Sequence, residues 1–142
     1  MPASPAVLLR FFDALVGAEV SLWGDADAAV TAGTSAGLGT VSALGVIAGH
    51  GDDARVQDVA DGIGITVGAA SKLVDRLERD GLVVRAPNPS DRRSSLLRMT
   101  ADGRRVLDDG SGVLVHVLGE RLADLDETTL ASATEVLESL RG

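Results

Sequence analysis

The side chains best suited to chemistry in this sequence are cations that recur at helical spacing. Lys72, Arg76 and Arg79 are separated by four and three residues, so on a helix they lie on one face, opposite Leu73 and Leu77. Ammonium and guanidinium groups bind phosphate and the acceptor atoms of base edges. This face therefore predicts contact with a nucleic acid, whereas the simpler interpretation is an ordinary solvated helix surface.

Two hydroxyl residues accompany this cationic face. Thr66 fits the N-cap of the helix, and Thr66 and Ser71 can both donate hydrogen bonds to a phosphate or a base edge. Small residues occupy positions 68–70, where longer side chains would read bases, so we expect sparse direct readout and a larger contribution from DNA shape. Asp75 belongs to the same candidate surface, although an ion pair with a neighbouring cation is the simpler role for it.

A second pair of cations lies in the polar segment PNPSDRR, residues 87–93. Its composition predicts a hairpin loop between strands at 82–85 and 95–99. Arg92 and Arg93 would lie at the tip of this loop, where a guanidinium can enter the narrow, electronegative minor groove of DNA. Two arginines in an exposed loop can also serve only solubility.

The apolar periodicity predicts the elements that must position these residues. Steps of three and four predict helices from about 6 to 30, over 41–49, 56–63 and 66–80, from 100 to about 122, and from 126 onward. Gly62-Ile63-Gly64 predicts a tight turn with positive backbone angles between the third and fourth helices. Two short helices joined by such a turn and followed by a hairpin make a winged helix-turn-helix. The fold class is therefore mainly α, with about six helices and a small β-hairpin wing.

Residues 66–103, TVGAASKLVDRLERDGLVVRAPNPSDRRSSLLRMTADG, resemble the DNA-binding core of the MarR family of bacterial transcriptional regulators. The resemblance rests on the helix SKLVDRLERDGLV, on the D-x-R of Asp91 and Arg93, and on MTADG where the family commonly has L-T-x-x-G. It implies that Arg93 enters the minor groove while Asp91 orients it. It also implies regulation of promoters, with repression expected, and a small phenolic or lipophilic effector bound between the winged segment and the dimerisation helices.

The sequence then divides into three parts within one compact chain. Residues 1–53 supply N-terminal helices for dimerisation and support, 54–100 form the DNA-binding winged helix-turn-helix, and 101–142 supply a linker helix and a dimerisation helix. Both ends carry apolar residues that the terminal helices of a monomer do not need. These residues are Val7, Leu8, Phe11 and Phe12 at one end, and Leu130, Ala133, Leu137 and Leu140 at the other. With the resemblance, they predict a homodimer that binds an inverted-repeat operator in double-stranded DNA.

Charge is distributed unevenly along the chain. The formal net charge is −8, yet residues 55–105 hold ten Lys or Arg and seven Asp or Glu, a balance of +3. The remainder holds three basic and fourteen acidic residues, a balance of −11. A basic middle can face a polyanion while the acidic flanks face away, so DNA binding should depend on salt.

The composition argues against several other classes of protein. The absence of cysteine removes disulfides, thiolate metal sites and cysteine nucleophiles, and two isolated histidines without a phosphate-binding loop supply no nucleophile-and-base pair. We therefore expect neither enzyme activity nor a cofactor. No signal peptide or long apolar stretch is recognisable, so we expect a cytoplasmic protein that does not bind membranes.

Three residues outside the winged segment suggest further hypotheses. Trp23 could line the effector pocket, although a single aromatic residue is more often part of a core. His116 and Glu120 could supply two metal ligands from one helix, and His50 is the other histidine. A metal-sensing regulator is therefore one alternative function, although the sequence lacks the dense cluster of ligands that a zinc site normally has. The other alternative function is a winged helix that binds protein instead of DNA. The small residues at the helix tip and the net charge of −8 favour this alternative.

Overall fold

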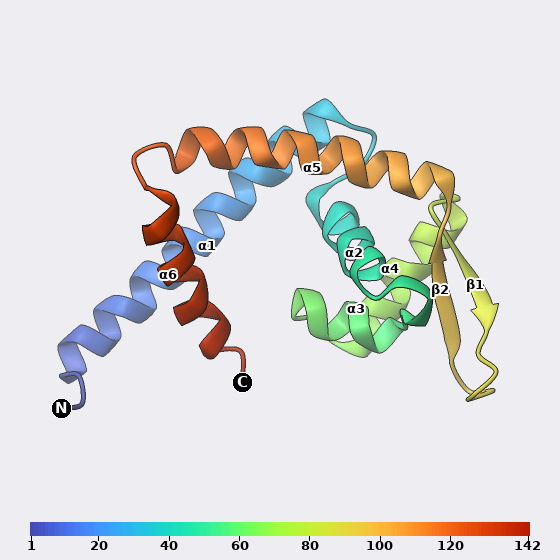
Figure 1. Ribbon diagram of the computed structural model, residues 1–142, viewed down its shortest axis with the longest axis horizontal. Helices are drawn as coiled ribbons and strands as arrows, with labels where there is room; N and C mark the ends of the chain where they lie inside the picture. The colour runs from blue at the N-terminus through green and yellow to red at the C-terminus, as the bar shows by residue number, and fades with distance from the viewer.

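The computed structural model describes all 142 residues, which form six α-helices, a short 3-10 helix and one β-hairpin. Figure 1 shows how these helices and strands are arranged. The helices are α1 (Pro5–Gly33), α2 (Leu38–Gly49), α3 (Val56–Ile63), α4 (Val67–Arg79), α5 (Ala101–Arg121) and α6 (Glu127–Ser139), with η1 at Gly51–Asp53. The hairpin consists of β1 (Val83–Pro87) and β2 (Ser95–Met99), paired antiparallel. The predicted fold class, with six helices and one hairpin, is confirmed. None of the helices has the length and apolarity needed to cross a bilayer.

The long helices α1 and α5 hold two separate groups of elements apart. In Figure 1, α2, α3, α4 and the hairpin gather beneath one end of α5, whereas α6 and the N-terminal part of α1 extend on the other side. We call residues 38–100 the lobe, and we call α6 together with residues 5–25 of α1 the arm.

Buried side chains are concentrated in and next to the lobe. The largest that are fully buried are Leu44, Ile47, Leu77, Leu97, Val30, Val59, Val74 and Val83. Ala26 from α1 and Leu107 from α5 join the same cluster. Because α2 packs into this core with α3 and α4, the core crosses the predicted boundary at residue 54. The three-part division thus stays a prediction about function.

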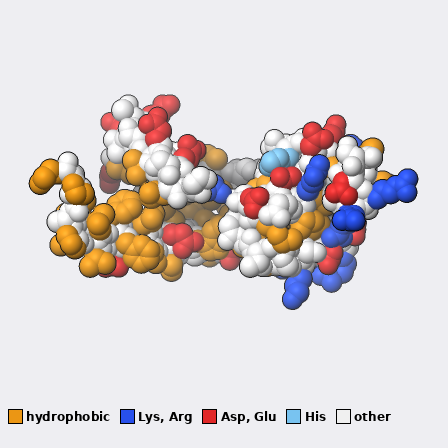
Figure 2. Space-filling model, turned by 90° about the horizontal axis from the view of Figure 1, so that it is seen from below, with side chains coloured by type: hydrophobic (Ala, Val, Ile, Leu, Met, Phe, Trp, Pro, Cys, Tyr) orange, Lys and Arg blue, Asp and Glu red, His pale blue; other side chains and the backbone are white.

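The arm contains no buried residue at all. No residue before Ala26 or after Gly110 is buried, although both arm helices carry large apolar side chains. The exposed ones are Val7, Leu8, Leu9, Phe11, Phe12, Val16 and Val20 on α1, and Val136, Leu137 and Leu140 on α6. Figure 2 shows hydrophobic side chains running along this part of the molecule. A face of this kind on a folded protein normally contacts another molecule.

The predicted N-cap Thr66 is confirmed, and Thr100 and Asp126 cap the two helices predicted to begin at these positions. Thr66, Thr100 and Asp126 each accept a hydrogen bond from the backbone N–H three residues later, at 3.1, 3.0 and 2.7 Å. The bond to Asp126 favours its charged form and holds the pKa of this carboxyl below its ordinary value. Helices α4, α5 and α6 therefore begin where local sequence signals place them.

The turn between α3 and α4 is confirmed in part. Gly64 ends α3 in the left-handed region with φ of 72°, as predicted. Gly62 lies inside α3 with ordinary helical backbone, so the prediction of a positive angle there is wrong. Its role is close packing, since a Cβ at Gly62 would lie 2.6 Å from Cγ2 of Val46 on α2.

Candidate nucleic-acid interface

Helix α4 presents a mixed surface that follows from its 3.6-residue period. Ala70, Val74 and Leu77 are buried in the core of the lobe. The opposite side of the helix is left to solvent and carries Lys72, Asp75, Arg76, Glu78 and Arg79. The exposed first turn consists of Val67, Gly68 and Ala69, so few long side chains extend from the helix tip.

Thr66 and Ser71 lie where they can donate hydrogen bonds. The hydroxyl oxygen of Thr66 accepts from Ala69, which leaves its own proton free. Ser71 is half-buried and makes no side-chain hydrogen bond within the chain. It lines a groove between α4 and the hairpin with a volume of about 400 Å³. We call this the wing groove, and its lining is Arg55, Val56, Gln57, Val67, Ser71, Arg85, Arg93, Ser94 and Ser95.

Three arginines converge on the wing groove. Arg93 was predicted to act at the DNA surface, whereas Arg55 and Arg85 were not singled out from the sequence. Arg55 immediately precedes α3, the first helix of the helix-turn-helix, which in such motifs crosses the DNA backbone. That position was the signal that could have identified it.

Arg85 differs from the other two because it is already paired. Its Nη2 lies 2.7 Å from Oδ1 of Asp75, and its Nη1 lies 3.1 Å from Oε1 of Glu78. The hydrogen bond that Arg85 donates to Asp75, above all, raises the pKa of Arg85. The predicted ion pairing of Asp75 is confirmed, but its partner lies on β1 and not on the same helix. A direct role for Asp75 at DNA stays a prediction.

Arg98 also has a carboxylate partner, Asp52 at 3.0 Å, but the remaining cations of the lobe have none. No Asp or Glu oxygen lies within 4.0 Å of the charged groups of Arg55, Lys72, Arg76, Arg79, Arg92 or Arg93. In Figure 2, Lys and Arg side chains gather on the lobe, while the arm carries none of comparable density. Uncompensated cations on one body are available to a polyanion.

The wing tip is held by its own polar side chains. Asp91 accepts a hydrogen bond from the backbone N–H of Arg93 at 2.9 Å, so it fixes the turn that carries both arginines. Asn88 is 5% exposed; its amide donates to Ser94 at 3.1 Å and accepts from the backbone N–H of Ser90 at 3.0 Å. The sequence did not single out Asn88, although Asn favours such turns.

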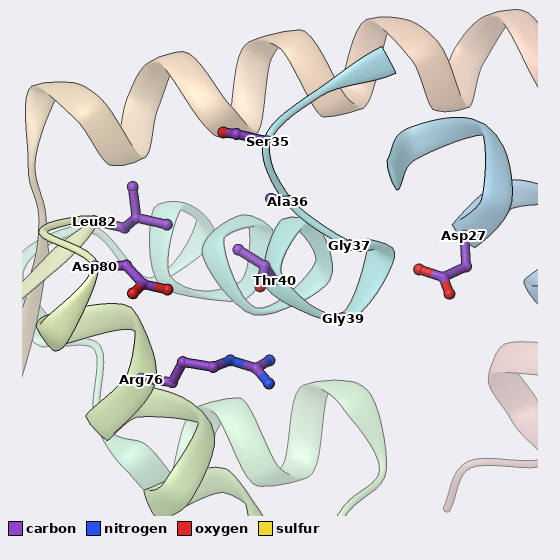
Figure 3. A pocket seen from close by; sticks show the side chains of 9 residues that line it. All are labelled: Asp27, Ser35, Ala36, Gly37, Gly39, Thr40, Arg76, Asp80 and Leu82. Atoms are coloured by element: carbon purple, nitrogen blue, oxygen red, sulfur yellow. The ribbon is translucent and has the colours of Figure 1, made fainter. Parts of the chain in front are cut away.

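Lys72 and Arg76 face a cleft between α4 and the junction of α1 with α2. The cleft consists of two adjoining cavities that share Gly39 and Arg76. The polar one, about 660 Å³, is shown in Figure 3 and is lined by Asp27, Ser35, Ala36, Gly37, Gly39, Thr40, Arg76, Asp80 and Leu82. The apolar one, about 400 Å³, is lined by Trp23, Gly39, Ile63, Ile65, Ala69, Lys72, Leu73 and Arg76.

This cleft changes the expected division of α4 into faces. Leu73 lies beside Lys72 and Arg76 at the apolar cavity, so the prediction that it lies opposite them is wrong. Successive residues on a helix are only about 100° apart, which leaves Leu73 half-buried at the edge of the core. Trp23 is 45% exposed and forms a wall of the same cavity, so its role at an effector stays a prediction.

The histidines lie away from both the wing groove and the cleft. Nε2 of His116 is 3.5 Å from Oε1 of Glu120 on α5, and Nδ1 of His50 is 3.9 Å from Oδ2 of Asp58. The predicted His116–Glu120 pairing is therefore present. No third His, Asp or Glu joins either pair to form a metal-binding group.

Comparison with known proteins gives consistent similarities. A sequence profile of the MarR family matches residues 38–94. The HTH-type transcriptional regulator MhqR of Bacillus subtilis is 29% identical over 89 residues, which are 63% of this chain and 61% of MhqR. The chain spans between about half and three fifths of the length of the curated relatives it matches.

Solved structures resemble the chain over nearly its whole length. CouR from Rhodococcus jostii RHA1, solved with bound p-coumaroyl-CoA, superposes with a TM-score of 0.80 at 27% identity, over 94% of this chain and 91% of CouR. Sco3205, a MarR family transcriptional regulator from Streptomyces coelicolor solved in complex with DNA, gives a TM-score of 0.83 at 22% identity, over 99% of this chain and 89% of Sco3205. The likeness to Sco3205 concerns the fold.

Proposed function

The chain belongs to the MarR family, and on that premise we propose that it is a homodimeric transcriptional regulator that binds an inverted-repeat operator and represses promoters. The observation that carries this proposal is the concentration of unpaired cations on α4, the wing and the start of α3. Its curated relatives are named as HTH-type transcriptional regulators, which supports a regulator rather than an enzyme. A protein that binds chromosomal DNA acts in the cytoplasm of a bacterium.

Two parts of the lobe would contact DNA. Helix α4 enters the major groove with Lys72 and Arg76, and Thr66 at its N-terminus binds a backbone phosphate through its free hydroxyl proton. Arg92 and Arg93 at the wing tip enter the minor groove. The wing groove, with Arg55 and Ser71, fits the phosphate backbone between the two grooves.

The dimer follows from the arm. A second copy would cover the exposed apolar faces of α1 and α6, which nothing in the chain itself covers. Two lobes related by a two-fold axis present two α4 helices to successive major grooves, which requires an operator with inverted-repeat symmetry.

Selection from random double-stranded DNA tests this proposal. We expect an inverted repeat whose half-sites lie one helical turn apart, bound with an affinity that falls steeply with salt. The Lys72→Ala, Arg76→Ala variant should lose this binding, whereas the matched Arg10→Ala variant, outside the lobe, should keep it. Recovery of only asymmetric sites, or salt-independent binding, would contradict the proposal and favour a winged helix that binds protein.

We further propose that an organic anion with an apolar body releases the protein from DNA by binding in the cleft. Trp23, Ile63 and Leu73 offer an apolar wall, and Lys72 and Arg76 offer cations at its edge. Because Arg76 also belongs to the DNA surface, a ligand that engages it would withdraw it from DNA. CouR, at 27% identity, was solved with an aromatic acyl-CoA anion.

Calorimetric titration with an aromatic carboxylate and its uncharged methyl ester tests this effector. The carboxylate should bind and weaken operator binding, and the ester should do neither. Trp23→Ala should reduce carboxylate binding while keeping operator binding. Equal binding of the acid and the ester would contradict the role of Arg76 in binding the carboxylate of the effector.

A further inference from the structure

The C-terminal end of the arm touches the lobe at one residue. Nη2 of Arg141, just past the end of α6, donates to the carbonyl oxygens of Asp61 and Gly62 at 3.2 and 3.1 Å. In Figure 1, α6 descends from α5 and brings the C-terminus to the side of the lobe where α3 ends. The arm is also connected to the lobe through the C-terminal part of α1 and through α5, both of which pack against α2.

The two carbonyls that Arg141 contacts are ones that a helix leaves unpaired. The last four carbonyls of an α-helix have no donor within the helix. In α3, Ala60 accepts from the backbone N–H groups of Gly64 and Ile65, both at 3.0 Å, whereas Asp61 and Gly62 accept from no backbone N–H. The guanidinium of Arg141 supplies the missing donor and places a positive charge at the negative end of the helix dipole.

The contacted end of α3 is a rigid part of the lobe. Gly62 packs so closely on α2 that a Cβ would lie 2.6 Å from Val46 Cγ2. One turn further along the chain, Thr66 begins α4. A change in the position of Gly62 would therefore also displace α2 and the start of α4, which together with α3 form the helix-turn-helix and its support.

We propose that Arg141 is a positioning residue, which caps α3 from the arm and thereby fixes the distance between the arm and the DNA-binding lobe. This inference rests on the proposed function. In a homodimer whose arms interlock, the distance from arm to lobe sets the separation of the two α4 helices. That separation determines which half-site spacing the dimer binds.

DNA binding by an Arg141→Ala variant tests the consequence for spacing. The probes are the duplex recovered by selection and two derivatives whose half-site spacing is one base pair shorter or longer. We expect the variant to bind the selected duplex about two- to fivefold more weakly, the effect of one cation at a helix C-terminus, and to discriminate less between the three spacings. Arg141→Lys should recover most of the discrimination, because an ammonium can donate to the same carbonyls.

The dependence of affinity on salt separates positioning from direct contact. Arg141→Ala should leave the slope of log affinity against log salt unchanged, whereas loss of a phosphate contact would lower it by about one. The matched control is Arg10→Ala, which removes the other unpaired cation of the arm, and the mass of every variant in solution is checked. A lowered slope, unchanged discrimination between spacings, or a monomeric Arg141→Ala variant would each overturn the proposal.

Amide hydrogen exchange tests the cap without DNA. Arg141→Ala should speed exchange at Gly64 and Ile65, whose N–H groups close the end of α3, and should leave the amides of α5 unchanged. Unchanged exchange at both residues would overturn the capping contact even if the protein binds DNA. Conversely, faster exchange in a protein that failed to bind DNA would refute the proposed function and not the cap.

Discussion

Arg85 determines how much negative charge α4 presents to a ligand. It pairs with Asp75 and Glu78 at once, and this contact links the outer face of α4 to the first strand of the wing. Its guanidinium is less exposed than either carboxylate, so it remains in place while the carboxylates stay near solvent. The single cation therefore offsets half of the charge of a carboxylate pair that would repel DNA phosphate.

We predict that Arg85→Gln weakens operator binding about threefold or more at low salt, because two carboxylates would face DNA within a Debye length. Adding Asp75→Asn should restore most of the affinity, which distinguishes repulsion from loss of a direct contact. Stability to urea should fall by no more than about 1 kcal/mol, since the pair is partly exposed. Gel-shift titrations of the three proteins measure the effect; no recovery in the double variant would contradict it.

A second prediction concerns Arg93 at the wing tip. Arg93→Ala should weaken operator binding about tenfold or more, on the scale of 1–3 kcal/mol for a specific contact. The midpoint of urea unfolding should change little, because Arg93 contributes to the turn through its backbone N–H, which alanine retains. Unchanged operator affinity would contradict the proposal that the wing contacts DNA through Arg93.

These residues show where sequence reasoning succeeds and where it stops. The arginines of the wing are recognisable because their loop is marked by local composition. The pairing of Asp75 with Arg85 spans ten residues and depends on how β1 packs against α4, so helical spacing alone does not indicate it. Arg55 enters the wing groove for the same reason, since a three-dimensional packing brings it there.

At the scale of elements, the segment Thr100 to Gly103 joins the wing to α5. Thr100 caps α5, donates its hydroxyl proton to Gly81 O at 2.6 Å and its backbone N–H to Leu82 O at 3.0 Å. A Cβ at Gly103 would lie 2.1 Å from Leu82 O, so α5 can approach the wing this closely only with glycine there. The T-x-x-G pattern is thus a packing requirement.

We predict that Gly103→Ala destabilises the protein by about 1–3 kcal/mol, the usual cost of overpacking. The matched control is Gly112→Ala on the same helix, where a Cβ meets nothing within 4 Å. That control should be neutral or should stabilise the protein by up to about 1 kcal/mol, because alanine is the better helix former. Urea unfolding of both variants decides the matter, and equal effects would contradict the packing argument.

The N-cap of α6 gives a prediction about pH. The pKa of Asp126 is lowered in the folded protein below its ordinary value of 3.8. Its stabilising effect is therefore complete above that value and is lost as pH falls through the lowered pKa. The difference in unfolding midpoint between the wild type and Asp126→Ala should be largest near neutral pH and should shrink in acid. A difference that stays constant down to the lowest pH at which both fold would contradict this assignment.

Elements were easier to predict than their junctions. Thr66, Thr100 and Asp126 mark helix starts through bonds that span three residues, so the signal lies within the sequence window itself. Gly62 looked like a turn residue because Gly64 stands two positions later. Glycine is needed at position 62, however, because the helix packs closely against Val46 of another helix. Contacts between distant elements leave no local signature of this kind.

On the scale of the whole molecule, the chain consists of one well-packed body and an arm that lacks a core. The absence of any buried residue before Ala26 or after Gly110 means that residues 5–25 of α1 and all of α6 need another molecule to exclude water from their apolar faces. The terminal apolar stripes in the sequence had indicated this need, but the position of the cleft beside α4 had not been predictable from periodicity.

We predict that Leu8→Glu together with Phe12→Glu converts the proposed dimer into a monomer at micromolar concentration. Both side chains are more than half exposed on one face of α1, at 57% and 62%, so charges there would be buried without partners in a dimer. Sedimentation equilibrium measures the mass, and operator binding should fall sharply because each half-site would then be bound separately. Asp13→Asn on the same helix is the control. An unchanged mass would locate the dimer interface elsewhere.

Trp23 gives the molecule an optical property as well as a wall of the cleft. It is the only tryptophan, and the chain has no tyrosine, so the intrinsic fluorescence of the protein comes from this one position in each subunit. Its indole is partly in water and borders the cavity that also contains Lys72 and Arg76. Emission wavelength and quenching by iodide should therefore report the state of the cleft directly. An unlabelled sample is enough to follow ligand entry in real time and to distinguish it from events at the wing.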